Sequence, residues 1–280
     1  KGVDEGLANQ GILTSDTVWF LDQAPARLAV IGGGAIGLEM AQIFQDFGSK
    51  VTLLEAQDRI LAEVEKEVAK ELTQILTNEP RLTLLTKVLV KQIRGTPGDM
   101  KVTYEDSEGK QRTTTCDRVV LATGKRPVLA PLALEKAGVA VDRHVVKVNT
   151  RGQTNVPHIY AVGDVVGGYM LAHTAGQQGR VAAATIAGED RVYDQDKDCG
   201  VIFTRPQAGF VGLSVDQAKA KGIDAVEIKA PMHLDAKAMI THERHGMIKI
   251  VADKKTRRII GVHFLADHAD TLIGEAVMMV

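Results

Sequence analysis

Cysteine is scarce in this sequence. The 280 residues contain only Cys116 and Cys199. Two cysteines so far apart cannot build a disulfide framework, and they exclude a CxxC zinc motif or a closely spaced redox pair within these residues. Such sparse use of cysteine suits a reducing compartment, so a cytoplasmic location is expected.

The sequence has neither an excess of one charge nor a long hydrophobic run. Its 34 Lys and Arg nearly balance 35 Asp and Glu, for a net charge of -1, which offers no electrostatic footprint for nucleic acid. No apolar run approaches the length of a membrane-spanning helix, so a soluble protein without a membrane partner is expected. A hydrophobic fraction of 45% is ordinary for globular proteins, and the length suffices for two or three domains.

Patterns of metal ligands and of a catalytic triad are missing as well. His242 and His245 are three residues apart in a polar turn, which is not the spacing of the HExxH zinc motif. No cluster with ligand spacing is formed by His144, His158, His233, His263 and His268, and no serine lies in a GxSxG turn. The sequence therefore predicts neither a metal site nor a serine-hydrolase triad.

A strand-helix-strand unit lies in the first third of the chain. The apolar run 27–31 meets three glycines and then a helical pattern over 36–47, and a second strand is expected over 51–54. This order is typical of a parallel sheet covered by helices. It is followed by a helix over 63–77, an antiparallel meander over 88–115 and a buried strand over 117–122.

The remainder of the chain predicts two further units. A strand over 159–162 ends at Gly163-Asp164, and a helix is expected over 171–186. From residue 199 onward the pattern predicts an α+β unit, with strands near 200–204, 208–213, 224–229, 246–252 and 258–265 and helices near 215–221 and 268–280. The apolar face of the last helix and the strands of 246–265 are expected to form a two-fold interface.

A GxGxxG motif joins the first strand to the first helix. Gly32 permits a tight turn, Gly34 lets a pyrophosphate approach the backbone, and Gly37 lets helix and strand pack closely. Glu55 ends the second strand, where a carboxylate accepts hydrogen bonds from both ribose hydroxyls and repels a 2′-phosphate. Together they predict dinucleotide binding, with NAD favoured over NADP.

Three further positions have both a structural and a functional interpretation. Glu39 suits the positive end of the helix dipole, or it reaches the nicotinamide end of a cofactor. The segment from Ala122 to Lys125 is a simple strand-to-loop turn, or it lines a ligand at the sheet edge. Asp164 is a helix cap, or it binds a cofactor hydroxyl.

The order of five motifs resembles the flavoprotein disulfide reductases, that is, the pyridine nucleotide-disulfide oxidoreductase family. These motifs are GGGAIGLE, VTLLE, VVLATGKRP, IYAVGDVVGGYMLAH and FTRPQAGFVGLS, and the resemblance runs over essentially all residues. Within the family the sequence looks most like dihydrolipoamide dehydrogenase, with mercuric reductase as a close relative. The resemblance implies an NAD domain over 1–121, the returning part of an FAD domain over 122–192, and a dimerisation domain from 193 to 280.

The resemblance also implies site residues, the cofactors NAD and FAD, and a homodimer. Glu39 would lie beside the nicotinamide and flavin, and Glu55 on the adenosine ribose. Other NAD contacts would come from Gly32, Gly33, Gly34, Ala35, Ile36, Gly37, Val88, Ala122, Thr123, Gly124 and Lys125. FAD contacts would come from Asp164, Met170, Leu171, Ala172 and His173.

Parts of the family's pattern are missing. The CxxxxC redox pair and the catalytic His-Pro are absent, and Cys116 and Cys199 match neither family cysteine. Lys125 replaces the more usual Arg, and Arg205 stands where an acidic residue is common. The chain is expected to be part of a longer polypeptide and inactive alone, since it opens without Met and ends within a helical pattern. The alternatives are a mercuric reductase-like flavoenzyme, which usually takes NADPH, and a non-catalytic NAD-binding and dimerisation module.

Overall fold

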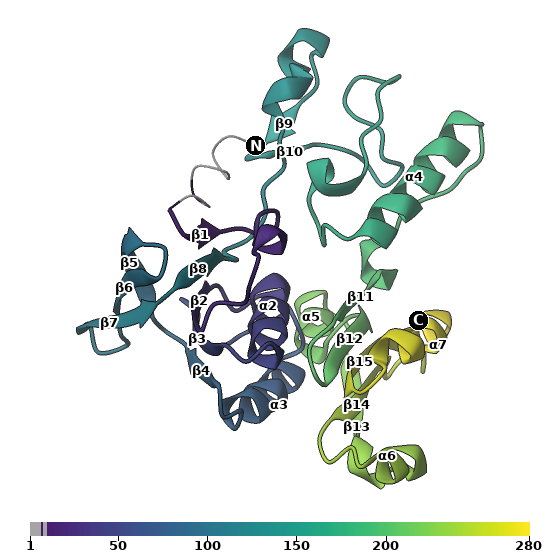
Figure 1. The fold of residues 1–280 in the computed structure, drawn as a ribbon. Helices are drawn as coiled ribbons and strands as arrows, with labels where there is room; N and C mark the ends of the chain where they lie inside the picture. Colours follow the sequence, from purple (N-terminus) through teal and green to yellow (C-terminus); the bar gives the residue numbers. More distant parts are fainter. Residues whose placement is uncertain (1–6, 8–9) are drawn as a thin grey trace.

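The computed structural model describes residue 7 and residues 10–280 (Figure 1). The first part is built on a parallel sheet in the order β1-β8-β2-β3-β4. These strands are β1 (Ile12–Leu13), β8 (Arg118–Leu121), β2 (Arg27–Ile31), β3 (Lys50–Leu54) and β4 (Leu82–Leu85). Ile31 pairs with Leu54 on one side and with Leu121 on the other. The residues that follow β2, β3 and β8 therefore meet at the edge of the sheet where the carboxyl ends of these strands lie.

Helices cover one face of this sheet and an antiparallel meander covers the other, as Figure 1 shows. The helices are α2 (Ala35–Asp46) and α3 (Lys66–Thr77), and the meander consists of β5 (Leu89–Thr96), β6 (Asp99–Glu105) and β7 (Gln111–Cys116). Leu28 and Val30 pack in the core on the helix side, whereas Ala29 and Ile31 pack in the core on the meander side. This alternation buries both faces of β2, as expected for a central parallel strand.

The middle of the chain carries a short hairpin and one long helix. The hairpin pairs β9 (Val141–Asp142) with β10 (Val145–Val146), and the helix is α4 (Ala172–Ile186). The strand predicted over 159–162 is wrong, because the described residues offer that segment only one isolated bridge, between Tyr160 and Gln153. A strand needs a hydrogen-bonded neighbour along its length.

An antiparallel sheet in the order β11-β12-β15-β14-β13 forms the last part. Its strands are β11 (Cys199–Ile202), β12 (Gln207–Gly212), β15 (Ile259–Ala266), β14 (Met247–Asp253) and β13 (Ala225–Pro231), with α5 (Val215–Ala220), α6 (Ala236–Thr241) and α7 (Ala269–Met279). The 3₁₀ turns among the described residues are η1 (Val18–Phe20), η2 (Ala130–Leu132), η3 (Leu134–Ala137), η4 (Gly163–Val166), η5 (Gln195–Lys197) and η6 (Met232–Leu234). The fold class predicted from the sequence is confirmed.

The two faces of the antiparallel sheet have different partners. Met247 and Leu265 belong to the core that also contains α2 and α3. Val262 and Phe264 belong to a separate cluster with Leu272, Ile273, Ala276 and Val280 at the end of the chain. One side of α7 is thus packed on the chain's own sheet, whereas Val277 and Met278 of the same helix are exposed. The two-fold interface expected from this helix and the strands of 246–265 stays a prediction.

A buried ion cluster joins the start of α3 to the antiparallel sheet. The Lys249 side chain on β14 is 1% exposed, and its Nζ lies 3.0 Å from Glu65 Oε1 and 3.1 Å from Glu227 Oε2 and also contacts Glu67. Burial alone would lower the pKa of Lys249, but hydrogen bonds to these three carboxylates raise it. Glu65 is at the same time the N-cap of α3. The cluster therefore fixes the start of α3 against the second sheet.

Within the described residues, none of the helices has the length and apolar character needed to cross a lipid bilayer.

Candidate functional site

A cleft opens at the edge where β2, β3 and β8 end. Its volume is about 610 Å³, within the range of cofactor sites in proteins. Many of the predicted residues line it: Gly32, Gly33, Gly34, Ala35, Glu55, Val88, Ala122, Thr123, Gly124 and Leu171. The structure therefore brings together residues that are up to 139 positions apart, from Gly32 to Leu171.

The glycines of the turn between β2 and α2 have different surroundings. A Cβ on Gly32, where φ is +113°, would lie 2.3 Å from the carbonyl oxygen of Ala122. A Cβ on Gly37 would lie 1.9 Å from the carbonyl oxygen of Gly32. A Cβ on Gly34 would meet no atom of the described residues within 4 Å. Gly32 and Gly37 are thus required for packing, whereas Gly34 leaves the backbone open to the cleft.

Glu55 is held rigidly at the end of β3. It is 8% exposed, its Oε2 accepts a hydrogen bond from the Gly33 N–H at 2.5 Å, and its Oε1 accepts one from the Gln57 N–H at 2.6 Å. Each carboxylate oxygen has a further lone pair for a ligand hydroxyl. The carboxylate is therefore preoriented beside the glycine turn by two main-chain donors.

Some of the remaining predicted dinucleotide contacts line the cleft beside this carboxylate, and others do not. Val88 is buried on the cleft wall, and its N–H donates to the Glu55 carbonyl at 3.0 Å. Ala122 is partly buried, and its N–H donates to the Ile31 carbonyl at 2.8 Å. Ile36, Gly37 and Lys125 do not line the cleft, and Lys125 is exposed.

Glu39 does not line the cleft either. Its Oε1 accepts a hydrogen bond from the Phe203 N–H at 2.9 Å, so it ties α2 to the segment after β11. Burial raises the pKa of Glu39, although the hydrogen bond from Phe203 lowers it. Two further residues of α2 contact Arg205. Gln42 forms hydrogen bonds with the main chain of Arg205, and Asp46 forms an ion pair with its guanidinium at 2.7 Å.

The predicted flavin contacts lie at the two ends of the segment between η4 and α4. Asp164 is exposed on η4. Leu171 is the N-cap of α4 and lines the cleft, whereas Ala172 and His173 are exposed on the first turn of that helix. Met170 has a positive φ of 52°. The first main-chain N–H groups of a helix have no partner within it, so this turn is suited to an electronegative group.

Sequence reasoning missed two aromatic residues and one arginine in the cleft. Tyr169 and Phe210 line it, and their ring centroids are 5.5 Å apart. The Arg59 guanidinium donates to the carbonyls of Val64 and Ala62 and so shapes the loop along its rim. The glycine pair directly before Tyr169 was the one local signal available, because a glycine-rich turn at a sheet edge often borders a ligand.

Neither cysteine belongs to this cleft. Both are free, and Cys116 is buried at the end of β7. Burial raises the pKa of Cys116 to about 11 and also raises that of Cys199. Both thiols are therefore protonated near neutral pH and are poor nucleophiles.

Comparison with known proteins assigns the sequence to a family. The profile described as pyridine nucleotide-disulphide oxidoreductase matches residues 1–179, and the profile of its dimerisation domain matches residues 198–280. A dihydrolipoyl dehydrogenase of Chlamydia pneumoniae is 36% identical over 270 residues, which cover 96% of this chain and 57% of that protein. A mercuric reductase of Bacillus cereus is 34% identical over 277 residues, which cover 98% of this chain and 44% of that protein.

Solved structures show the same fold. LpdA from Mycobacterium tuberculosis superposes with a TM-score of 0.87 at 28% identity, over 96% of this chain and 58% of that one. The HOCl-induced flavoprotein disulfide reductase RclA from Escherichia coli superposes with a TM-score of 0.82 at 28% identity, over 96% of this chain and 61% of that one. The chain thus spans about half the length of the curated relatives that it matches.

Proposed function

The chain belongs to the pyridine nucleotide-disulphide oxidoreductase family, and on this basis we propose that it is the nicotinamide-binding part of an NAD-linked, FAD-dependent disulfide oxidoreductase. The dihydrolipoyl dehydrogenases among its relatives favour that activity. The observation that carries the proposal is the carboxylate of Glu55, which two main-chain N–H groups hold beside an open glycine turn.

The residues of the cleft fit a dinucleotide. The N–H groups at the start of α2 and the open backbone at Gly34 would receive the pyrophosphate. Glu55 would accept hydrogen bonds from the adenosine ribose and disfavour a 2′-phosphate. Val88, with the strand end at Ala122, would cover the same cofactor. The proposed set also contains Ile36, Gly37 and Lys125, although these three residues do not line the cleft.

The proposed flavin site uses fewer residues of this chain. Asp164 would bind the ribityl hydroxyls of FAD, and the main-chain amides of Met170, Leu171, Ala172 and His173 would face the flavin. NAD(H), when bound, would supply or accept a hydride. Glu39 would lie on the nicotinamide side, where its hydrogen bond from Phe203 fixes the carboxylate. The chain's own part in this chemistry is to bind, orient and shield the cofactors.

We divide the chain into an NAD domain over 1–121, a returning FAD segment over 122–192 and a dimerisation domain over 193–280. The match of the last part to a dimerisation profile supports a homodimer. Only one side of α7 packs on its own sheet, so the proposed interface would use exposed apolar side chains such as Met278 on α7, together with Ile228 and Ile240. The two free thiols favour a reducing compartment, and we therefore place the protein in the cytoplasm.

Residues 1–280 alone are proposed to be inactive toward a disulfide substrate. The thiols of Cys116 and Cys199 are poor nucleophiles, and no other cysteine is present. A dithiol that exchanges electrons with a flavin must therefore come from outside these residues.

The test compares electron acceptors in the complete polypeptide that carries this sequence. Oxidation of NADH that depends on lipoamide supports the proposed function. Oxidation that depends on Hg²⁺, with NADPH preferred, would replace it with a mercuric reductase-like activity. This activity is the second candidate, because the mercuric reductase of Bacillus cereus is among the relatives. NADH binding without turnover on either acceptor would identify a non-catalytic binding module.

A further inference from the structure

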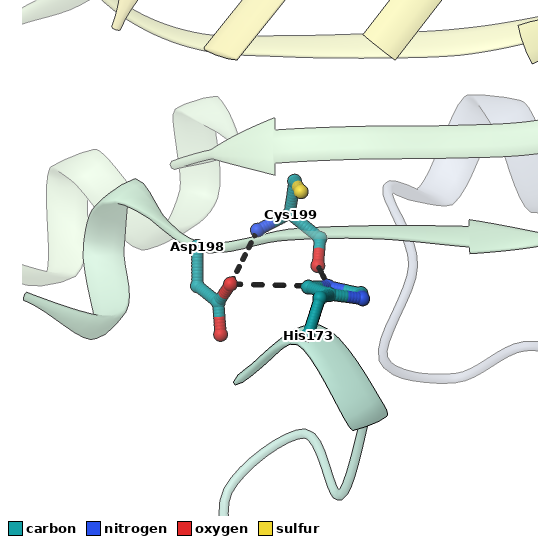
Figure 2. A group of neighbouring side chains, drawn as sticks. All are labelled: His173, Asp198 and Cys199. Atoms are coloured by element: carbon teal, nitrogen blue, oxygen red, sulfur yellow. Dashed lines mark hydrogen bonds and ion pairs between the residues drawn. The ribbon is translucent and has the colours of Figure 1, made fainter. Parts of the chain in front are cut away.

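Three ligating side chains meet where the start of α4 approaches the start of β11. Figure 2 shows His173 on the first turn of α4, with Asp198 and Cys199 on the neighbouring segment. One donor atom of each side chain lies within 4.8 Å of the other two. We propose that His173, Asp198 and Cys199 form a binding site for a transition-metal ion of the Zn²⁺ class.

Asp198 is preoriented for this role. Its side chain is 8% exposed. Its Oδ2 accepts hydrogen bonds from Thr174 Oγ1 at 2.5 Å and from Tyr193 OH at 2.7 Å. Its Oδ1 accepts one from the Cys199 N–H at 2.9 Å. Hydrogen bonds to a carboxylate ligand from outside the metal site are the usual means of fixing its orientation.

The exposed side chain of His173 has the freedom that closure around an ion requires, whereas Cys199 is partly buried. The His173 side chain is 51% exposed, and its Nε2 lies 3.9 Å from Asp198 Oδ1 and 2.6 Å from the Cys199 carbonyl oxygen. Ligands bound to zinc at about 2.0–2.3 Å in a tetrahedron lie about 3.4 Å from one another. The donor atoms lie at most 4.8 Å apart. The separations are therefore too long by at most about 1.4 Å, a gap that rotation of the imidazole and of the cysteine side chain can close.

The chemistry of the donors selects the class of ion. A thiolate and an imidazole favour Zn²⁺ or Co²⁺ over Mg²⁺ and Ca²⁺, which prefer oxygen ligands. Binding would form a sulfur–metal bond at Cys199, and the thiol proton would pass to solvent without any redox change. Three protein ligands leave a fourth position open to water. The proposed flavin contacts of residues 170–173 use main-chain amides and leave this imidazole free.

The test titrates the reduced chain with Co²⁺ under nitrogen and records the near-ultraviolet sulfur-to-cobalt charge-transfer band. We expect a band that saturates at one equivalent. The Cys199→Ser variant should lose the band, and the Cys116→Ala variant, which removes the only other thiol, should keep it. Absence of the band in the unmodified chain at millimolar Co²⁺, or a band that survives Cys199→Ser, would overturn the proposal.

The other two ligands are tested by Zn²⁺ calorimetry. His173→Gln changes a half-exposed side chain and should weaken binding at least tenfold without lowering the melting temperature. Tyr193→Phe removes a hydrogen bond to Asp198 and should weaken binding by about tenfold, as is typical of residues that orient a ligand. Unchanged Zn²⁺ affinity in His173→Gln would exclude the site, whatever the result for Tyr193→Phe.

Discussion

At the scale of single residues, the cleft separates residues required for packing from those that leave room for a ligand. Gly32 and Gly37 are closed in by backbone atoms, whereas Gly34 faces open space. The sequence motif could predict these roles, because the spacing GxGxxG reflects a fixed turn geometry. It could not predict Tyr169 or Phe210, which reach the cleft only through tertiary packing.

The Gly34→Ala variant should lose cofactor affinity and keep its fold. The added methyl group meets no atom of the described residues within 4 Å, and the backbone at Gly34 has φ -78°, which alanine adopts without strain. The free energy of unfolding should change by no more than about 1 kcal/mol, the usual effect at a helix N-cap. Binding of NADH, measured by its fluorescence, should weaken at least tenfold, since the methyl group would stand where the pyrophosphate approaches.

The Gly37→Ala variant is the matched control. Its methyl group would clash with the Gly32 carbonyl oxygen at 1.9 Å, so urea unfolding should show a loss of about 3 kcal/mol or more. Equal stability losses in the two variants, with equal NADH binding, would contradict the division of roles between the glycines.

The two thiols should react slowly and unequally with a disulfide reagent such as DTNB. Cys116 is 2% exposed, and burial raises its pKa to about 11. At pH 7 its thiolate fraction is therefore about 10⁻⁴. In the folded chain Cys199 should be modified first, and Cys116 only after denaturant is added. Rapid modification of Cys116 without denaturant would contradict the burial of this thiol.

At the scale of helices and strands, the sequence predicted those elements whose hydrophobic pattern is local. The strand over 27–31, the meander and all five strands of the last sheet lie within a few residues of their predicted positions. The apolar segment 159–162 was misassigned because a strand also depends on a neighbour that sequence pattern does not reveal. Packing between distant segments also brings Glu39 to Phe203. It likewise brings His173 to Asp198 and Cys199.

The ion cluster between the start of α3 and the antiparallel sheet should be a major contributor to stability. Lys249→Met would leave Glu65 buried without its cation, which typically costs about 3–5 kcal/mol. Lys254→Met is the matched control, because its partner Asp224 and the lysine itself are both more than half exposed. That variant should lose less than about 1 kcal/mol. Similar losses in urea unfolding for both variants would contradict the importance of the buried cluster.

The same cluster should contribute to acid sensitivity. Hydrogen bonding to Lys249 lowers the pKa of Glu67 below that of an unfolded chain. The stabilisation is therefore present above a pH of about 4.3 and is lost as the pH falls through the lower, folded pKa. Between pH 5 and pH 3 the unmodified chain should lose more stability than Lys249→Met, as measured by urea midpoints. Parallel pH profiles for the two chains would exclude this contribution.

At the scale of the whole molecule, residues 1–280 should not retain FAD. Asp164 is exposed, and it and the first turn of α4 form only one side of the proposed flavin site. Each remaining hydrogen bond must compete with water and contributes only about 0.5–1.5 kcal/mol. After gel filtration with added FAD, the visible spectrum should show no bound flavin. Stoichiometric yellow colour would mean that the described residues form a complete flavin site.

Assembly is also a property of the whole chain. We expect a homodimer whose sedimentation coefficient depends on protein concentration, since exposed apolar side chains such as Ile228 and Ile240 lie on the second sheet and its helix α6. Replacing both with lysine should shift the equilibrium toward the monomer. A strict monomer in the unmodified chain at high concentration would contradict the proposal.

The most direct test of NAD binding is a parallel calorimetric titration with NADH and NADPH. Carboxylate–phosphate repulsion and lost ribose hydrogen bonds at Glu55 should favour NADH by roughly 2–3 kcal/mol, or about 30- to 150-fold in Kd. The Glu55→Gln variant has nearly the same shape without the charge, so it should bring the two affinities within about fivefold of each other. Equal affinities in the unmodified chain, or a ratio unchanged by Glu55→Gln, would contradict the account.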